Sequence, residues 1–115
     1  MSKTAADLVK EAKASITEIS VADAKGLTDG ETVFIDVREP PEWQDGTVPG
    51  ALTIPRGVLE WKSADEKQLE NKSTSIVVYC KSGGRSALAA QSLQVLGYDN
   101  VKSMAGGYEA WAKES

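Results

Sequence analysis

The sequence predicts an α/β fold, with a small, mainly parallel sheet of five strands flanked by helices on both faces. Two runs, 32–37 and 76–79, are rich in apolar, β-favouring residues, which is typical of strands buried on both faces in a parallel sheet. Other segments repeat their apolar residues at three- and four-residue steps, the spacing of a helix. Alternating strands and helices favour a parallel sheet. The length of 115 residues is typical of one domain.

The chain opens with a predicted helix over residues 5–16. Its apolar residues share one face, so we expect the helix to pack on the domain or to cap its edge. These residues are Ala5, Leu8, Val9, Ala12 and Ile16. Residues 17–19 form a short extended segment. Ser20, with Asp23 three residues on, is a predicted N-cap for a short helix that ends near Gly26.

The middle of the chain supplies two further strands. The run 32–37 is the second strand, and the prolines at 40–41 prevent further strand pairing after it. A brief third strand is predicted over 51–54, followed by a short helix over 58–61. The polar residues of 62–75 are predicted to lie mostly on the surface, with one helical turn near Leu69.

The last third of the chain repeats the strand–helix pattern twice. Residues 76–79 are the predicted central strand, and the helix after Ser86 ends near Gly97, a residue suited to a left-handed helix end. A last strand over 101–104 leads into a terminal helix that carries Trp111. The sequence has no repeat and no sign of a second domain.

The composition excludes several classes of site. Lys and Arg number 13 against 17 Asp and Glu, so the chain lacks the clustered positive charge of a nucleic-acid surface. One cysteine cannot form an internal disulfide. The absence of histidine excludes Cys/His zinc sites and a histidine general base, and we expect neither a metal nor a cofactor. Without a leader-like or membrane-spanning run, the expectation is a cytoplasmic protein with no membrane partner.

The stretch that begins at the predicted central strand carries the candidate chemistry. Cys80, the only cysteine, follows the strand directly, and two glycines, an arginine and a serine come after it. Glycines let successive backbone N–H groups point inward, and the following helix adds its positive dipole end. Both features favour an anion at the loop centre and can activate a thiol without histidine. The predicted site therefore has Cys80 as nucleophile in a loop formed by Lys81, Ser82, Gly83, Gly84, Arg85 and Ser86.

Charged and aromatic residues elsewhere could border this loop. Lys81 could attract an anionic substrate, and Arg85 could do the same or pair with a carboxylate that holds the loop. Asp36 and Arg38 come at a strand end, where ligands bind in open α/β sheets. For Asp36 an ion pair that fixes the loop is the favoured interpretation, whereas Arg38 is the better substrate neighbour. Trp61 could also reach the site, while Trp43 and Trp111 are predicted to be packing residues.

The sequence resembles the rhodanese-like family of single-domain sulfurtransferases. Four segments carry the resemblance in the family's order: 34–39 (FIDVRE), 42–55 with its GTVPGALTIP run, 79–86 (YCKSGGRS) and 96–111, which ends in GGYEAW. The likeness covers residues 17–113 within one domain of 115 residues, with the helix of 1–16 added before it.

The resemblance implies that Cys80 accepts a sulfane sulfur from a small anionic donor such as thiosulfate and forms a persulfide, which a thiol, a thiol-bearing protein or cyanide then takes. It also implies that the backbone of 81–86 holds the persulfide and that the Arg85 side chain stabilises the site. Thr47 departs from the family pattern, which commonly has histidine there.

Two other functions stay open from the sequence. A phosphatase or an arsenate reductase would use the same thiolate, but phosphatases of this fold carry five residues between cysteine and arginine, and this chain carries four. The alternative is a non-catalytic sulfur carrier or regulatory module, which the loop alone does not distinguish from an enzyme.

Overall fold

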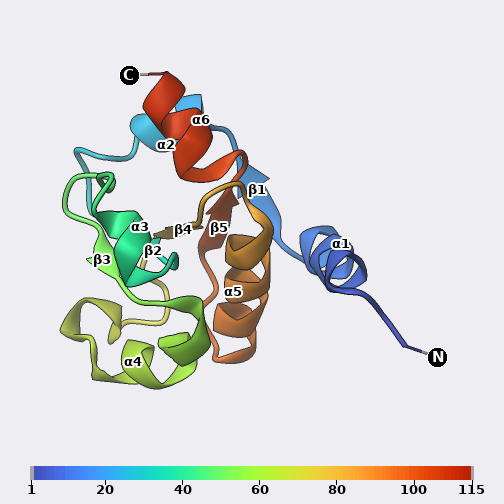
Figure 1. Ribbon diagram of the computed structural model, residues 1–115. Helices are drawn as coiled ribbons and strands as arrows, with labels where there is room; N and C mark the ends of the chain where they lie inside the picture. Colours follow the sequence, from blue (N-terminus) through green and yellow to red (C-terminus); the bar gives the residue numbers. More distant parts are fainter. Residues whose placement is uncertain (1, 115) are drawn as a thin grey trace.

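The computed structural model describes residues 2–114 and is built on one five-stranded parallel sheet (Figure 1). The strands are β1 (Thr17–Ile19), β2 (Val33–Asp36), β3 (Leu52–Thr53), β4 (Ile76–Tyr79) and β5 (Val101–Met104). Their order in the sheet is β1-β5-β4-β2-β3, and every neighbouring pair is parallel. The predicted fold class is therefore confirmed, with β4 at the centre of the sheet.

Helices connect the strands and cover both faces of the sheet. They are α1 (Ala5–Ser15), α2 (Val21–Lys25), α3 (Pro40–Trp43), α4 (Leu59–Asp65), α5 (Gly84–Val95) and α6 (Gly107–Lys113), with 3-10 turns at Arg56–Val58 and Lys67–Leu69. The predicted N-cap before α2 forms, because the Ser20 hydroxyl accepts a hydrogen bond from the Asp23 amide at 3.0 Å.

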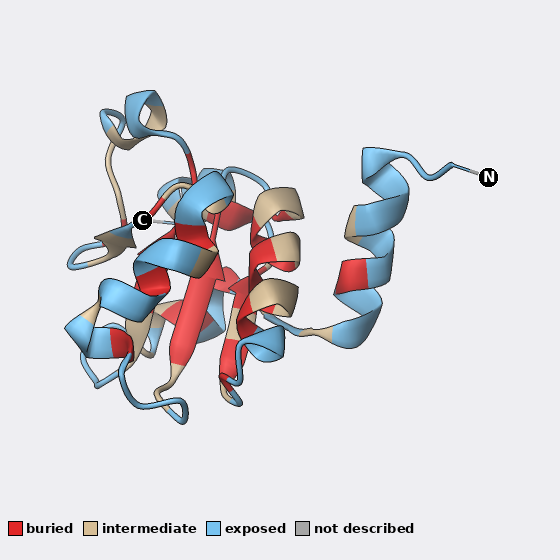
Figure 2. Cartoon of the chain, turned by 90° about the horizontal axis from the view of Figure 1, so that it is seen from below, coloured by how far each residue is buried: buried red, intermediate tan, exposed pale blue. Residues whose placement is uncertain are grey.

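Each face of the sheet has its own hydrophobic core. On one face Ile35, Val78 and Cys80 pack with Leu59 of α4 and Leu93 of α5. On the other face the core is smaller and joins the strands to α2 and α6; it includes Val21, Phe34, Val77, Tyr79 and Met104. Figure 2 shows the central strands in red, and β2, β4 and β5 are the strands whose residues are mostly buried. Burial on both faces explains why β2 and β4 lack polar alternation.

Helix α1 packs on α5, as expected for a helix added to the domain. Its contact face is narrower than the apolar pattern predicts: Ala12 is fully buried, Val9 and Ile16 are half-buried, and Leu8 is 47% exposed. Figure 2 shows this helix to one side of the sheet, exposed apart from one buried segment.

The structure adds detail to two local predictions. The prolines at 40–41 do more than end β2, because they occupy the first positions of α3, where proline fits a helix without losing a hydrogen bond. The segment 62–75 is mostly exposed and has a 3-10 turn at Lys67–Leu69, as predicted, but the helix before it continues to Asp65 and Leu69 is buried, at 1% exposure.

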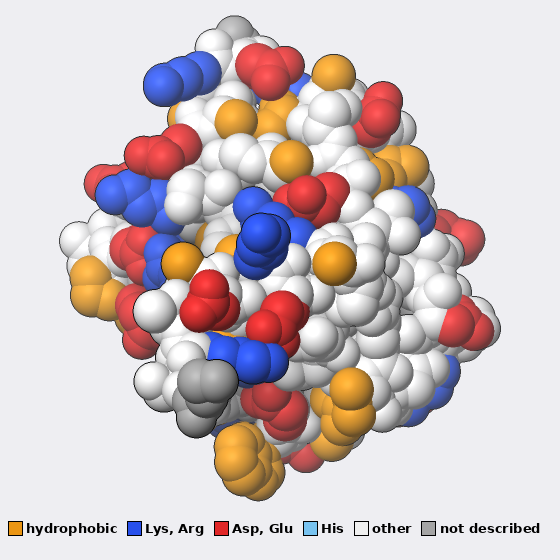
Figure 3. Space-filling model, turned by 90° about the vertical axis from the view of Figure 1, so that its right-hand side faces the viewer, with side chains coloured by type: hydrophobic (Ala, Val, Ile, Leu, Met, Phe, Trp, Pro, Cys, Tyr) orange, Lys and Arg blue, Asp and Glu red, His pale blue; other side chains and the backbone are white. Residues whose placement is uncertain are grey.

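The surface is mixed in charge. Acidic and basic side chains are interspersed over the face seen in Figure 3. None of the helices within residues 2–114 has the length and hydrophobicity needed to cross a membrane.

Candidate active site

Cys80 lies at the carboxyl end of β4, where the chain turns into α5. The residue is 1% exposed. Its Sγ accepts a hydrogen bond from the Gly83 amide at 3.1 Å, and its thiol donates to the Ser86 hydroxyl at 3.6 Å. The sulfur therefore lies inside the turn, against the first residues of the helix.

Gly83 allows this turn to be so short. It is the N-cap of α5 and has φ +117°, a conformation that other residues rarely adopt. The helix accordingly begins at Gly84, two residues before the predicted start at Ser86. This correction brings Ser86 into the first turn of the helix, where its N–H and its hydroxyl both lie near the sulfur.

The surroundings of Cys80 lower the pKa of its thiol. Burial alone raises this pKa, but the Ser86 hydroxyl and the backbone amides of Ser86, Gly83 and Ser82 stabilise the thiolate and outweigh burial. Hydrogen bonds to the charged form favour ionisation. The thiol is thus activated by fixed dipoles, without a histidine.

Helix α6 holds the loop from behind. The Tyr108 amide donates to the Cys80 carbonyl at 2.8 Å, and the Glu109 amide donates to the Lys81 carbonyl at 3.1 Å. Gly107 makes this approach possible: it has φ +58°, and a Cβ there would lie 2.5 Å from the Lys81 oxygen. With their carbonyls bound by α6, the loop peptides direct their amides toward the sulfur.

Arg85 is paired with a carboxylate rather than free. Its Nη1 and Nη2 donate to the two carboxylate oxygens of Glu42 at 2.7 and 3.0 Å. This pairing, with a smaller opposing effect of burial, lowers the pKa of Glu42 to about 2. The arginine also interacts electrostatically with Cys80. Of the two roles expected for Arg85, the geometry therefore matches the one that ties the loop to α3.

Asp36 and Arg38 form a second, fully buried pair at the end of β2. The Arg38 Nη2 lies 2.7 Å from the Asp36 carboxylate, and Arg38 also donates to the carbonyls of Glu42 and Gly46. Its guanidinium carbon lies 4.4 Å from the ring centre of Tyr108. Asp36 thus takes part in the expected ion pair. Arg38 borders a hollow of about 170 Å³ beside Lys81, but its donors already bind protein groups.

Trp61 lies away from the loop, and Trp111 is in a packing position. Trp61 is 74% exposed on α4. Its neighbour Glu60 lines a hollow with Val95 and Leu96, at the end of α5 opposite to the Cys80 loop, and Figure 1 shows α4 beside that lower end of α5. The structure therefore does not bring Trp61 to the site. Trp111 packs edge-on against Phe34, with ring centres 6.2 Å apart.

Sequence reasoning assigned no site role to Glu42, Ser103 or Gly107. Ser103 on β5 lies 2.8 Å from the Ser86 hydroxyl. The double glycine between a predicted strand and a predicted helix indicates a special backbone position at Gly107. The sequence does not indicate that Gly107 lies against the backbone of Lys81. Within residues 2–114 no group of three or more His, Cys, Asp or Glu side chains could hold a metal ion.

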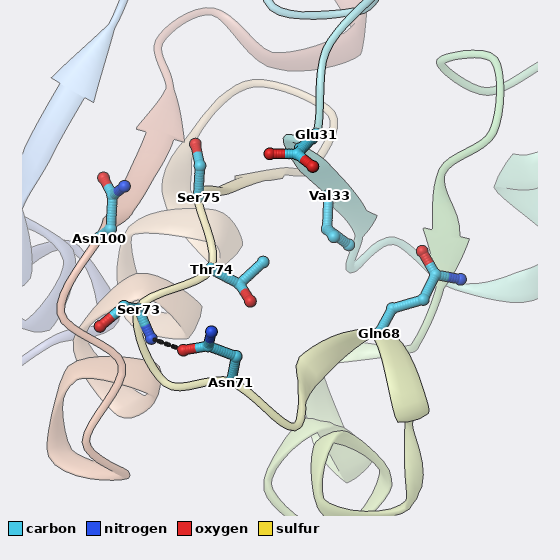
Figure 4. Close-up of a pocket in the computed structure, with 8 residues that line it drawn as sticks. All are labelled: Glu31, Val33, Gln68, Asn71, Ser73, Thr74, Ser75 and Asn100. Atoms are coloured by element: carbon cyan, nitrogen blue, oxygen red, sulfur yellow. Dashed lines mark hydrogen bonds between the residues drawn. The ribbon is translucent and has the colours of Figure 1, made fainter.

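A second hollow lies at the opposite edge of the sheet, where the strands begin. It measures about 580 Å³ and is lined by residues before β2, β4 and β5, including Glu31, Asn71 and Asn100 (Figure 4). Glu31 is the only acidic or basic residue in its lining, and Cys80 is not part of it.

Comparison with known proteins identifies a family and several similar proteins. The Rhodanese-like domain family matches residues 20–114. A putative thiosulfate sulfurtransferase, mitochondrial, from Schizosaccharomyces pombe is 37% identical over 73% of this chain and 66% of its own length. Thiosulfate sulfurtransferase 16, chloroplastic, from Arabidopsis thaliana is 37% identical over 84% of this chain and 88% of its own length. A solved structure from Rhodopseudomonas palustris, described as a protein of unknown function and possible tyrosine phosphatase, is 31% identical, with TM-score 0.87 over 99% of this chain and 92% of its own.

Proposed function

Because this chain belongs to the rhodanese-like domain family, we propose that it is a sulfurtransferase that moves a sulfane sulfur through a persulfide on Cys80. The observation that carries the proposal is the position of the Cys80 sulfur, 3.1 Å from the Gly83 amide at the start of α5. This environment favours a sulfur anion both before and after a sulfur atom is gained.

The first step loads the cysteine. The Cys80 thiolate attacks the outer sulfur of thiosulfate, or of a persulfide donor. A sulfur–sulfur bond to Cys80 forms as the donor's sulfur–sulfur bond breaks, and sulfite, or the donor's thiolate, leaves with the electron pair. The exposed Lys81 beside the site supplies a positive charge that attracts an anionic donor.

The second step unloads it. An acceptor nucleophile, cyanide in an assay or a thiolate in a cell, attacks the outer sulfur of the persulfide. The bond to Cys80 breaks, and the cysteine is released as a thiolate, which the loop amides stabilise. The product is thiocyanate or a new persulfide, and the protein returns to its starting state.

Loading with thiosulfate, followed by intact-mass measurement, tests the proposal directly. Wild type is expected to gain one sulfur atom, which cyanide removes. Cys80→Ser is the matched control, since it keeps a similar shape and removes the only thiol. A wild type that gains no sulfur, or a Cys80→Ser variant that gains it equally, would overturn the proposal.

A phosphatase is the second candidate, because the similar Rhodopseudomonas palustris protein is described as a possible tyrosine phosphatase. Two features weigh against it. The loop has four residues between Cys80 and Arg85, and Arg85 is paired with the Glu42 carboxylate, which offsets the positive charge that would bind a phosphate. Hydrolysis of a generic aryl phosphate that is lost in Cys80→Ser would support the phosphatase instead.

A sulfur carrier would use the same first step. Persulfide formation without sustained thiosulfate–cyanide turnover, together with transfer to a thiol-bearing protein, would indicate the carrier. Steady turnover with small acceptors would indicate the enzyme.

A further inference from the structure

Two buried serine hydroxyls follow one another from the Cys80 sulfur, each at hydrogen-bond distance from the next group. Ser86, in the first turn of α5, has its Oγ 3.6 Å from the sulfur. Ser103, on β5, has its Oγ 2.8 Å from that of Ser86. Both serines are fully buried, and the three groups come from a strand end, a helix and the neighbouring strand.

The number of protons on Cys80, Ser86 and Ser103 limits which of these groups can donate a hydrogen bond and which must accept one. A thiolate has no proton and can only accept, so the Ser86 hydroxyl must donate its single proton to the sulfur when Cys80 ionises. The Ser86 oxygen can then only accept from its other neighbour. Ser103 is the hydroxyl at hydrogen-bond distance on that side, and its proton fits this need.

The position of Ser103 is otherwise unusual for a polar residue. It lies in a strand between β4 and β1, paired with Val78 on one side and Glu18 on the other. Burial of a hydroxyl is costly unless it is hydrogen-bonded. Within residues 2–114, Ser86 is the one side chain found at hydrogen-bond distance from the Ser103 hydroxyl.

We propose that Ser103 is a positioning residue for the Cys80 chemistry: it donates a hydrogen bond that fixes the Ser86 hydroxyl in the orientation that donates to the sulfur anion. A serine in a helix can otherwise turn its hydroxyl toward a backbone carbonyl of the preceding turn. A hydrogen bond from Ser103 disfavours that alternative, so the Ser86 hydroxyl is held where it can donate to the sulfur once Cys80 loses its proton.

Charged groups around the loop act separately from the two serines. Arg85 of α5 interacts electrostatically with Cys80 and is paired with Glu42 of α3. Arg38 is paired with Asp36 at the end of β2. Lys81 on the loop and Glu109 of α6 line the hollow beside the loop. Substitution of Ser103 changes none of these charges.

The test compares two variants that have the same shape. Ser103→Thr and Ser103→Val are both β-branched and suit a strand, but only threonine keeps the hydroxyl. The rate of Cys80 alkylation by iodoacetamide, followed against pH in the absence of a sulfur donor, reports the thiolate fraction. We expect Ser103→Val to slow alkylation at pH 7 about three- to ten-fold and to move the pH profile to higher pH, while Ser103→Thr stays near wild type.

Ser63→Ala is the control for loss of a buried serine hydroxyl elsewhere. Ser63 is 2% exposed on α4 and bonds the Glu60 carbonyl, and its loss should leave the alkylation profile unchanged. Should Ser103→Val fail to fold, Ser103→Ala takes its place. Equal profiles for the threonine and the hydroxyl-free variants would overturn the proposal.

A double variant tests whether Ser103 acts through Ser86. In a Ser86→Ala background, Ser103→Val should cause no further slowing of alkylation, because the hydroxyl that it orients is gone. Equal effects of Ser103→Val in both backgrounds would contradict the proposal. The inference rests on the proposed function only in taking Cys80 as the reacting group. If wild type does not load sulfur, the proposed sulfurtransferase function is overturned. The role of Ser103, which is measured by the pH dependence of Cys80 alkylation, is not affected by that result.

Discussion

Hollows of different size and construction lie at the two ends of the strands, which we call the amino edge, where the strands begin, and the carboxyl edge, where they end. At the amino edge, a hollow of about 580 Å³ is lined mainly by uncharged polar residues. At the carboxyl edge, a hollow of about 170 Å³ beside Lys81 is lined by members of two ion pairs, and the serine pair that leads to Cys80 lies buried at the same edge. Preorganised dipoles, rather than a large open volume, therefore distinguish the candidate active site from the hollow at the amino edge.

The largest expected effect comes from the buried pair at the carboxyl edge. Asp36→Ala leaves Arg38 buried, at 3% exposure, without its carboxylate. Removal of one partner from a buried pair typically costs about 3–5 kcal/mol. We therefore expect a fall of that size in the free energy of unfolding, measured by urea denaturation.

Glu31→Ala is the matched change at the amino edge, where the carboxylate is exposed. It should change the free energy of unfolding by less than about 0.5 kcal/mol. Similar losses of unfolding free energy in Asp36→Ala and Glu31→Ala would show that the buried ion pair at the carboxyl edge contributes no more to stability than the exposed carboxylate at the amino edge.

The contact behind the loop should give the next largest effect. In Gly107→Ala the new Cβ would lie 2.5 Å from the Lys81 oxygen and 2.6 Å from the Cys80 oxygen, in a residue with φ +58°. Strain and crowding together should cost about 2–3 kcal/mol. Because the loop must shift, Cys80 alkylation at pH 7 should also slow.

Gly57→Ala is the control for this change. A Cβ at Gly57 would meet no atom within 4 Å, and the residue has no positive φ, so alanine should leave stability unchanged or raise it by less than about 1 kcal/mol. A Gly107→Ala variant with wild-type stability and wild-type alkylation would show that α6 does not hold the loop.

The ion pair between Arg85 and Glu42 should make the free energy of unfolding depend on pH in the acidic range. The pKa of Glu42 is lowered from 4.5 to about 2 in the folded protein, so its contribution is complete above about pH 4.5 and is lost as the pH falls toward 2. The side chain is 29% exposed, and screening reduces the contribution to about 1 kcal/mol. Glu42→Gln should lose this amount at pH 6 and differ little from wild type near pH 2.

Chemical denaturation at a series of pH values measures the difference. Glu31→Gln, at the amino edge, should follow the wild-type curve throughout. A constant gap between wild type and Glu42→Gln from pH 6 to pH 2 would indicate a loss of packing instead of a loss of charge.

The sequence was sufficient to predict the strands and the position of Cys80, because both depend on short-range patterns. An apolar run identifies β4, and a cysteine followed by two glycines identifies the turn. The partners of this turn could not be predicted in the same way. Glu42 and Arg85 are 43 residues apart, and Ser86 and Ser103 are 17 apart. Their pairing depends on the order of strands and on side-chain orientation, which no local pattern records.

The error at α3 has a different physical origin. Proline blocks strand pairing but also fits the first turn of a helix, so the two prolines are compatible with either a loop or a helix start. The Glu42 carboxylate, which accepts from the Glu39 amide at 2.9 Å, completes that helix start and points toward Arg85. Even the correct assignment would not have identified Arg85 as the partner of Glu42, because the two residues are 43 positions apart in the chain.

The smallest effect is expected at the larger hollow. Gln68 lines it and is exposed, in a short 3-10 turn (Figure 4). Gln68→Ala removes an exposed amide at the rim of this hollow, so the free energy of unfolding should change by less than about 0.5 kcal/mol. Sulfur loading and Cys80 alkylation should match wild type, since this edge lies at the other end of the strands. A clear loss of sulfur loading in Gln68→Ala would mean that the amino edge affects the reactivity of Cys80. The chemistry would then not be confined to the carboxyl edge.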